Sequence, residues 1–205
     1  MGVPVVHLIT DRTICADLPA RARAALAGLP PGRAAVHLRE KALGGRAQLE
    51  LARALSAVCR ERGALLVVND RVDVALACGV EAVHLPSAGL TPAQARRLLG
   101  PGARVGVSCH SEAEVVRAIE AGADWATFGP VFDTPSKRAF GPPVGLEAMA
   151  RAARLGLPLV ALGGIDASNA GRAAAAGARG VAAIRAWLTG SDPAREVAAL
   201  AASLP

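Results

Sequence analysis

The stretch Ala75-Leu-Ala-Cys-Gly-Val-Glu-Ala-Val83 shares its plan with Ala118-Ile-Glu-Ala-Gly-Ala-Asp-Trp-Ala126 and with Ala173-Ala-Ala-Ala-Gly-Ala-Arg-Gly-Val181. In each stretch a run of helix-forming residues ends at a glycine, and a short apolar run follows it. Glycine takes the left-handed conformation at the end of a helix more readily than any other residue. The repeat therefore predicts a chain built from helix–strand junctions, each closed by a glycine.

The same alternation extends outward from these stretches over the whole chain. Short apolar runs predict strands at Val3–Thr10, Ala34–Arg39, Leu65–Val68, Ala82–Leu85, Arg104–Ser108, Trp125–Gly129, Leu159–Leu162 and Val181–Ile184. Segments of helical period predict helices at Leu18–Leu29, Arg46–Glu61, Val72–Cys78, Thr91–Leu99, Ser111–Ala121, Leu146–Leu155, Ser168–Ala176 and Pro193–Leu204. Thr91 before Pro92 is typical of a helix N-terminus, and Ser111 with Glu114 predicts a capping box.

Eight strand–helix units predict a closed (β/α)8 barrel, or TIM barrel, formed as a single domain by residues 1–205. The alternative is an open, doubly wound α/β sheet. The number of units and the lack of a Gly-x-Gly-x-x-Gly turn both favour the barrel. In such a barrel the active site lies at the carboxyl ends of the strands, which meet at one mouth.

The composition limits the classes of function. Hydrophobic residues make up 52% of the 205 residues and charged residues 20%, which excludes a disordered chain. Aromatic residues make up only 2%, so we expect no surface that stacks nucleic-acid bases. The net charge of +6 favours anionic ligands, and phosphate above all. No apolar run is long enough to cross a membrane, and the cysteines lack metal-binding spacing, so we expect a reduced, cytoplasmic chain without a leader peptide.

Basic residues gather at the predicted end of the second strand. By the two-residue period of a strand, His37, Arg39 and Lys41 share one face, where they would form an anion receptor in the barrel mouth. The alternative is that Lys41 and Glu40 are solvated loop charges. Two other histidines lie within apolar strands and are expected in the core, His7 and His84.

The ends of the third and fifth strands carry polar groups that suit substrate binding and proton transfer. Asn69 would hydrogen-bond a substrate ring, and Asp70 would either ligate Mg²⁺ or cap the helix that follows it. Ser108 would donate to a phosphate, and His110 would transfer protons. Cys109 alternates with them, and a buried structural role is favoured over a nucleophilic one.

Two further segments predict phosphate binding. The longest loop, Pro130–Val144, carries hydroxyl groups and cations in its first part, at Thr134, Ser136, Lys137 and Arg138. The seventh strand ends in Gly163 and Gly164, and the eighth in Ile184 and Arg185. The loops after these two strands form the recurrent phosphate site of barrels of this kind.

Six motifs occur along the chain as His37-Leu-Arg-Glu-Lys41, Asn69-Asp-Arg-Val-Asp73, Val83-His-Leu85, Gly106-Val-Ser-Cys-His110, Gly129-Pro-Val-Phe-Asp-Thr-Pro-Ser-Lys137 and Leu162-Gly-Gly-Ile165. Together they cover nearly the whole chain and resemble the thiamine phosphate synthase and TenI superfamily. The resemblance implies a hydroxymethylpyrimidine diphosphate site, which in synthases includes Mg²⁺, at Arg39, Lys41, Asn69, Asp70, Ser108, Thr134, Ser136 and Lys137. It also implies a thiazole phosphate site at Gly164 and the end of the eighth strand.

Three positions depart from the patterns of this superfamily. Pro86–Gly89 stands where synthases have Gly-Gln-(Asp/Glu)-Asp, whose last acid ligates Mg²⁺, so Asp70 would be left without its second carboxylate. The same segment, with the residues up to Arg96, resembles the TenI branch instead. Pro130 stands where a TenI-type tautomerase has a histidine, and Arg185 stands where the family has a serine.

The first hypothesis is therefore a TenI-like thiazole tautomerase, which acts on a thiazole phosphate by proton transfer and needs no cofactor. His110 is its candidate acid/base, with His37 as a substitute, while Arg39, Lys41 and Lys137 would orient the substrate. The alternative is a thiamine phosphate synthase with Mg²⁺, for which Lys137 and Asp70 are candidate catalytic residues. A further alternative is an inactive ligand-binding or regulatory homologue. The expected partner is a small phosphorylated thiazole, neither nucleic acid nor membrane, and a homo-oligomer is compatible with the sequence.

Overall fold

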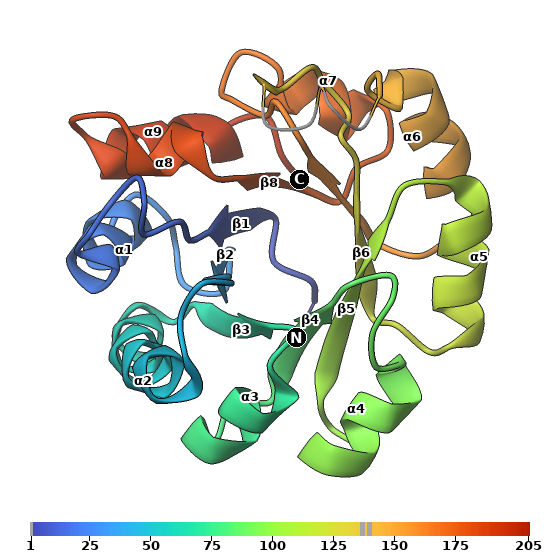
Figure 1. The fold of residues 1–205 in the computed structure, drawn as a ribbon. Helices are drawn as coiled ribbons and strands as arrows, with labels where there is room; N and C mark the ends of the chain where they lie inside the picture. Colours follow the sequence, from blue (N-terminus) through green and yellow to red (C-terminus); the bar gives the residue numbers. More distant parts are fainter. Residues whose placement is uncertain (1, 136–137, 139–140) are drawn as a thin grey trace.

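The structure is a computed structural model that describes residues 2–135, 138 and 141–205, and its parallel strands close into a barrel in the order β1 to β8. Figure 1 shows the strands around a common centre with the helices outside them. The strands are β1 (Val6–Ile9), β2 (Ala34–Leu38), β3 (Leu65–Asn69), β4 (Ala82–Leu85), β5 (Arg104–Cys109), β6 (Trp125–Phe128), β7 (Leu159–Leu162) and β8 (Gly180–Ala183). The predicted barrel is thus confirmed.

The helices follow the predicted segments: the second is one residue longer at each end, the third has the predicted bounds, and the other predicted helices are shorter overall. They are α1 (Leu18–Leu26), α2 (Gly45–Arg62), α3 (Val72–Cys78), α4 (Pro92–Leu99), α5 (Glu112–Glu120), α6 (Gly145–Ala153), α7 (Ala170–Ala175), α8 (Arg185–Leu188) and α9 (Pro193–Ala201). Helix α7 starts later than predicted because Asp166 Oδ1 accepts hydrogen bonds from the N–H and hydroxyl of Ser168, which holds that residue in a turn. Helix α8 was not predicted, since four residues are too few to show a helical period. Within the described residues, no helix combines the length and apolarity needed to span a membrane.

The predicted helix starts hold with one correction. Thr91 and Gln94 form a complete capping box at α4. At α5, Ser111 accepts the Glu114 N–H as predicted, but the Glu114 carboxylate accepts the backbone N–H of His110 instead of that of Ser111. The predicted reciprocal box is therefore wrong at α5, and its carboxylate fixes the backbone of a candidate site residue instead.

Apolar side chains pack in two layers, one inside the barrel and one between the strands and the helices. The inner layer consists of Ile9, Ala35, Val67, Ala82, Trp125, Val160 and Ala182. Trp125 is fully buried there and needs a neighbour without a side chain, because a Cβ atom added at Gly106 would lie 2.2 Å from its Cε2 atom. Trp125 is thus the largest side chain of the inner layer.

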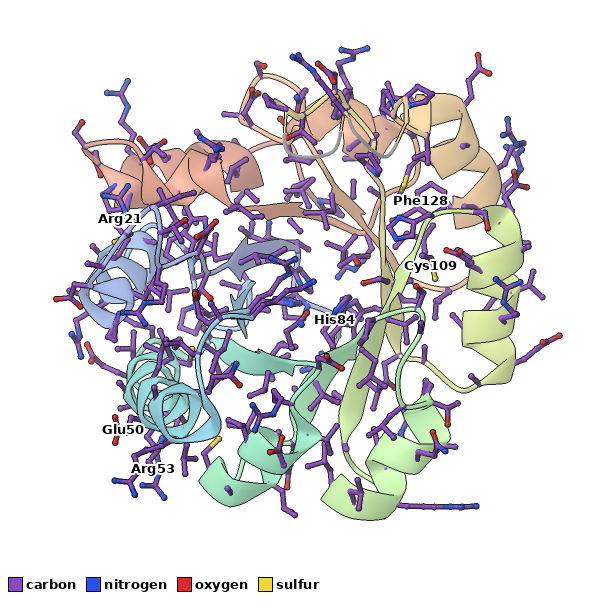
Figure 2. The ribbon with its side chains drawn as sticks, viewed as in Figure 1. Arg21, Glu50, Arg53, His84, Cys109 and Phe128 are labelled. Carbon is purple, nitrogen blue, oxygen red and sulfur yellow. The ribbon has the colours of Figure 1, made fainter. Side chains whose placement is uncertain are left out.

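Three buried histidines share this interior with Trp125. His7 donates from Nε2 to the Pro4 carbonyl at 3.0 Å, because a carbonyl only accepts, so its Nδ1 accepts from His37 Nε2 at 2.7 Å. His84 Nε2 lies 3.1 Å from the Thr127 hydroxyl, and Figure 2 shows His84 within the ring of strands. The predicted core positions of His7 and His84 are confirmed.

The expectation that His37 adds positive charge to the barrel mouth is wrong. His37 is only 2% exposed, and burial, with His7 and His84 nearby, holds its pKa well below the usual value. Burial likewise lowers the pKa of His7 to about 3 and that of His84 to about 4. The three rings are therefore neutral packing groups near pH 7.

The free energy of unfolding is expected to fall as the pH drops below about 6.5. Histidines in the unfolded chain bind protons near that pH, whereas the folded barrel keeps His7, His37 and His84 neutral until the pH is much lower, so protons favour the unfolded state. Each histidine adds a slope of up to about 1.4 kcal/mol per pH unit. Urea unfolding at about pH 7 and about pH 5 measures the difference, and equal values at both would contradict the neutral assignment.

Candidate active site

The candidate site residues at β2, β3 and β5 lie two residues beyond the inner layer, toward the carboxyl ends of the strands. His37, Val67 and Gly106 face the barrel interior, and the two-residue period puts Arg39, Asn69 and Ser108 on the same inner face, nearer the carboxyl ends. Asn69 lies in β3 and Ser108 in β5, and Arg39 directly follows β2. The three polar side chains therefore converge on the mouth of the barrel, as predicted from the sequence.

Arg39 and Lys41 stand on either side of a buried carboxylate. Glu40 is only 7% exposed, and both of its carboxylate oxygens lie 3.2 Å from the backbone N–H of Arg12, which they accept. The Gln48 side chain donates to the Glu40 carbonyl at 2.7 Å. Glu40 is therefore no solvated loop charge, as the alternative had it, but a brace that ties the loop after β1 to the loop after β2.

No ion pair within the described residues involves Arg39 or Lys41. Arg71, the next cation along the mouth, is held by both oxygens of Asp73 and by Gln48. Arg39 and Lys41 thus keep their charge available for an anionic ligand, whereas Arg71 serves to join α2 to the start of α3.

Asp70 follows β3 in a left-handed backbone conformation, with φ 65°, and is the one non-glycine residue with positive φ in the described chain. Its N–H donates to the His84 carbonyl at 2.9 Å, and its own carbonyl accepts the Val72 N–H at 3.1 Å. The alternative that Asp70 caps α3 is wrong, because the N-cap residue is Arg71 and no side chain caps that helix. Such a backbone at a strand end costs about 1 kcal/mol or more and occurs preferentially at functional sites.

His110 is fixed at the junction of β5 and β6. Its Nδ1 donates to the Gly129 carbonyl at 2.5 Å, so the neutral ring presents Nε2 as an acceptor. The neighbouring Cys109 is 2% exposed, and burial raises the pKa of its thiol to about 12, which confirms the structural role expected for it.

The loop after β6 runs beside the end of β7. The Val131 N–H donates to the Leu162 carbonyl at 2.8 Å, and the Phe132 N–H to the Gly163 carbonyl at 3.0 Å. Asp133 forms an ion pair with Arg138, which lowers the pKa of the Asp133 carboxyl. The expectation that Arg138 is a free cation for a phosphate is therefore wrong. Thr134 is half-buried, whereas Ser136 and Lys137 lie outside the described residues.

The turn after β7 requires glycine at both positions. Gly163 and Gly164 have φ values of 97° and 64°, and a Cβ atom added at either would lie 2.5 Å from the loop after β6, at Pro130 Cβ and at the Asp133 carbonyl oxygen respectively. The Gly164 carbonyl accepts from the Asn169 side chain at 2.7 Å. Since Phe132 and Asn169 take up the two glycine carbonyls, the N–H groups are the parts of this turn suited to an anion.

The end of β8 lies beside this turn in the closed barrel. Ile184 is half-buried against the inner layer, and Arg185 is exposed as the first residue of α8. Both residues thus stand at the barrel mouth, where the sequence predicts the second phosphate site.

Comparison with known proteins decides the family. Residues 6–187 match the family described as thiamine monophosphate synthase. The chain belongs to this family. A protein of Geobacter sulfurreducens, provisionally named a thiamine-phosphate synthase, is 48% identical over 98% of this chain and 94% of its own length. The thiamine-phosphate synthase of Laribacter hongkongensis is 41% identical over 95% of this chain and 94% of its own length.

A solved structure extends the comparison to the barrel itself. The thiamine phosphate pyrophosphorylase of Pyrococcus furiosus superimposes with a TM-score of 0.87 at 31% identity, covering 97% of this chain and 94% of the other. The protein is thus an enzyme of the thiamine monophosphate synthase family, which acts in thiamine biosynthesis. These relatives favour the synthase alternative, and none of them specifically supports the TenI branch.

The family implies Mg²⁺, yet the residues around Asp70 do not form a metal site on their own. The described residues contain no group of three or more His, Cys, Asp or Glu side chains that could hold a metal ion. Across from Asp70 stands Gly89, where an added Cβ atom would lie 3.7 Å from Asp70 Oδ1. The position that faces Asp70 thus offers no ligand atom from a side chain.

Two residues that shape this mouth, Thr10 and Glu40, do not follow from sequence patterns. For Glu40 the sequence offers a solvated loop charge only as an alternative, and it assigns no role to Thr10, whose hydroxyl accepts the Arg39 N–H at 2.9 Å. The signal available for Glu40 was its place between two cations in a polar loop, which usually indicates a solvated charge. Its partner, the Arg12 N–H, is 28 residues away in the sequence, so only the fold reveals the contact.

Proposed function

We propose that the protein is a thiamine-phosphate synthase, which joins hydroxymethylpyrimidine diphosphate to thiazole phosphate and releases diphosphate. The observation that carries the proposal is the similarity to proteins of that name over nearly the whole chain, at 41% identity in Laribacter hongkongensis and 43% in Methanoculleus marisnigri. Arg39 and Lys41, which form no ion pair with any described residue, support it, because the leaving group is a polyanion.

The coupling step makes one bond and breaks one. The lone pair of the thiazole nitrogen forms a bond to the methylene carbon of the pyrimidine, and the bond from that carbon to the diphosphate oxygen breaks. Diphosphate leaves with the bonding electrons, and no proton has to move in this step. Pro130, which replaces the histidine of a tautomerase, is therefore no obstacle to this reaction.

Side chains of the protein would neutralise the charge of the leaving diphosphate and orient the substrates. Arg39 and Lys41 would neutralise the departing diphosphate, with the guanidinium of Arg39 able to bind two phosphate oxygens at once. Ser108 would donate a hydrogen bond to the same group, and Asn69 would orient the pyrimidine ring. Further diphosphate contacts are proposed for Thr134, Ser136 and Lys137, and the thiazole phosphate is assigned to Gly163, Gly164, Ile184 and Arg185.

The test is the coupling reaction itself. Purified protein with both substrates and Mg²⁺ is expected to form thiamine phosphate, detected by fluorescence after oxidation, with release of one diphosphate per product. Omitting either substrate should abolish the signal. Absence of product, in conditions where a known synthase is active, would reject the proposal.

A second candidate, the thiazole tautomerase, is favoured by two observations. Gly89 leaves Asp70 without a partner carboxylate, and the Nδ1 contact of His110 with the Gly129 carbonyl leaves its Nε2 atom for proton transfer. A tautomerase would exchange the proton that it moves with solvent, so incubation of the carboxythiazole phosphate tautomer in D2O would incorporate deuterium into the product. The synthase proposal expects incorporation no faster than in the absence of protein.

A further inference from the structure

The residue opposite Asp70 is a glycine, Gly89, whose backbone does not have a positive φ. No left-handed backbone is required at Gly89, and the closest obstacles to an added Cβ atom are Pro86 Cγ at 3.0 Å and Cδ at 3.3 Å. A proline ring can shift by the few tenths of an ångström that such contacts require. The backbone therefore tolerates a side chain at position 89, and that side chain would start 3.7 Å from Asp70 Oδ1.

The electrostatic surroundings also disfavour a metal ion in the free protein. Asp70 is exposed, and a single exposed carboxylate binds divalent ions weakly because water competes for both partners. The adjacent loop carries Arg39 and Lys41, which form no ion pair in the part of the chain that the structure describes, and the whole chain has a net charge of +6. A bound anion reverses this balance, since diphosphate supplies both negative charge and several oxygen ligands.

We propose that Gly89 deprives the free protein of a resident divalent-cation site, so that Mg²⁺ enters this mouth only as its complex with diphosphate. The second half of the proposal rests on the proposed function, because it takes the diphosphate of the substrate as the carrier. The first half does not, since it concerns the protein without any substrate. Asp70 would then be the residue that holds the complex, through its single carboxylate.

Direct metal binding tests the first half. Mn²⁺ serves as the probe, and the loss of the free Mn²⁺ signal in electron paramagnetic resonance measures its binding to the full-length protein without substrate. Gly89→Asp is expected to bind one Mn²⁺ per chain at least about tenfold more tightly than the wild type. The matched control is Gly89→Asn, which has the same shape without the charge and should bind like the wild type.

The double variant Gly89→Asp with Asp70→Asn shows whether the new site uses Asp70. Asparagine also accepts the left-handed backbone of position 70, so this change keeps the local fold. We expect it to return Mn²⁺ affinity to the wild-type level. Equal affinities for Gly89→Asp and Gly89→Asn would overturn the proposal, as would tight Mn²⁺ binding by the wild type that is lost in Asp70→Asn.

Inorganic diphosphate tests the second half with the wild-type protein. In equilibrium dialysis, we expect the protein to retain Mn²⁺ when diphosphate is present. We expect no retention of Mn²⁺ without diphosphate. Retention of diphosphate that does not change when Mn²⁺ is added would overturn the idea of joint entry. Neither measurement depends on turnover, so a failed coupling reaction would reject the proposed function and leave the role of Gly89 to be decided by these binding data.

Discussion

Replacing Arg39 by alanine is expected to lower kcat/KM for the pyrimidine diphosphate by about 100-fold or more. Arg39 forms no ion pair within the described residues, so its charge is available to an anionic ligand. The departing diphosphate gains charge as the bond to carbon breaks, and a fixed guanidinium stabilises that charge more in the transition state than in the bound substrate. Steady-state kinetics with each substrate varied in turn measures the loss.

The matched control is Arg53→Ala, which removes the same charge from the exposed outer face of α2, far from the mouth (Figure 2). It should leave kcat/KM within about twofold of the wild type, because solvent screens a distant surface charge. If both variants lost activity equally, the effect would come from net charge and the role of Arg39 would be refuted. If only kcat/KM for thiazole phosphate fell, Arg39 would be assigned to the binding of thiazole phosphate instead.

Replacing Gly106 by alanine is expected to destabilise the barrel by about 3 kcal/mol. The added Cβ atom would lie 2.2 Å from Cε2 and 2.4 Å from Nε1 of Trp125, which is fully buried among the strands. A rigid indole inside a closed ring of strands has no free space into which it can move. Urea unfolding measures the change in the free energy of unfolding.

Gly102→Ala is the control for that measurement. An added Cβ atom there meets no other atom within 4 Å, so the free energy of unfolding should change by no more than about 0.5 kcal/mol. Equal stability of Gly106→Ala and Gly102→Ala would contradict the packing of Trp125 described above. Failure of the first variant to fold, with the second intact, would agree with it.

Local sequence rules predicted the architecture because each strand–helix unit carries its own signals. The glycines of the internal repeat, Gly79, Gly122 and Gly177, all have positive φ values in the structure, as the repeat requires. Burial depth was harder to predict. The two-residue period grouped His37, Arg39 and Lys41, but it cannot tell which member lies in the packed interior, because that depends on the seven other strands.

The candidate site was predicted where residues act through their position on a strand, and missed where they act through distant contacts. Asn69 and Ser108 follow from strand period alone. Glu40 does not, because its partner lies in the loop after β1 and is a backbone group, which no side-chain pattern reveals. Short motifs and whole-chain similarity favour different branches: Pro86–Gly89 resembles TenI proteins, whereas relatives over the whole chain carry the synthase name.

The most direct test of the account is a comparison of two activities in one preparation of the wild-type protein. One assay follows thiamine phosphate formation from the two coupling substrates, and the other follows conversion of the carboxythiazole phosphate tautomer. We predict coupling with one diphosphate released per product, and tautomer conversion no faster than without protein. Tautomer conversion without coupling would contradict the account and assign the barrel mouth to proton transfer.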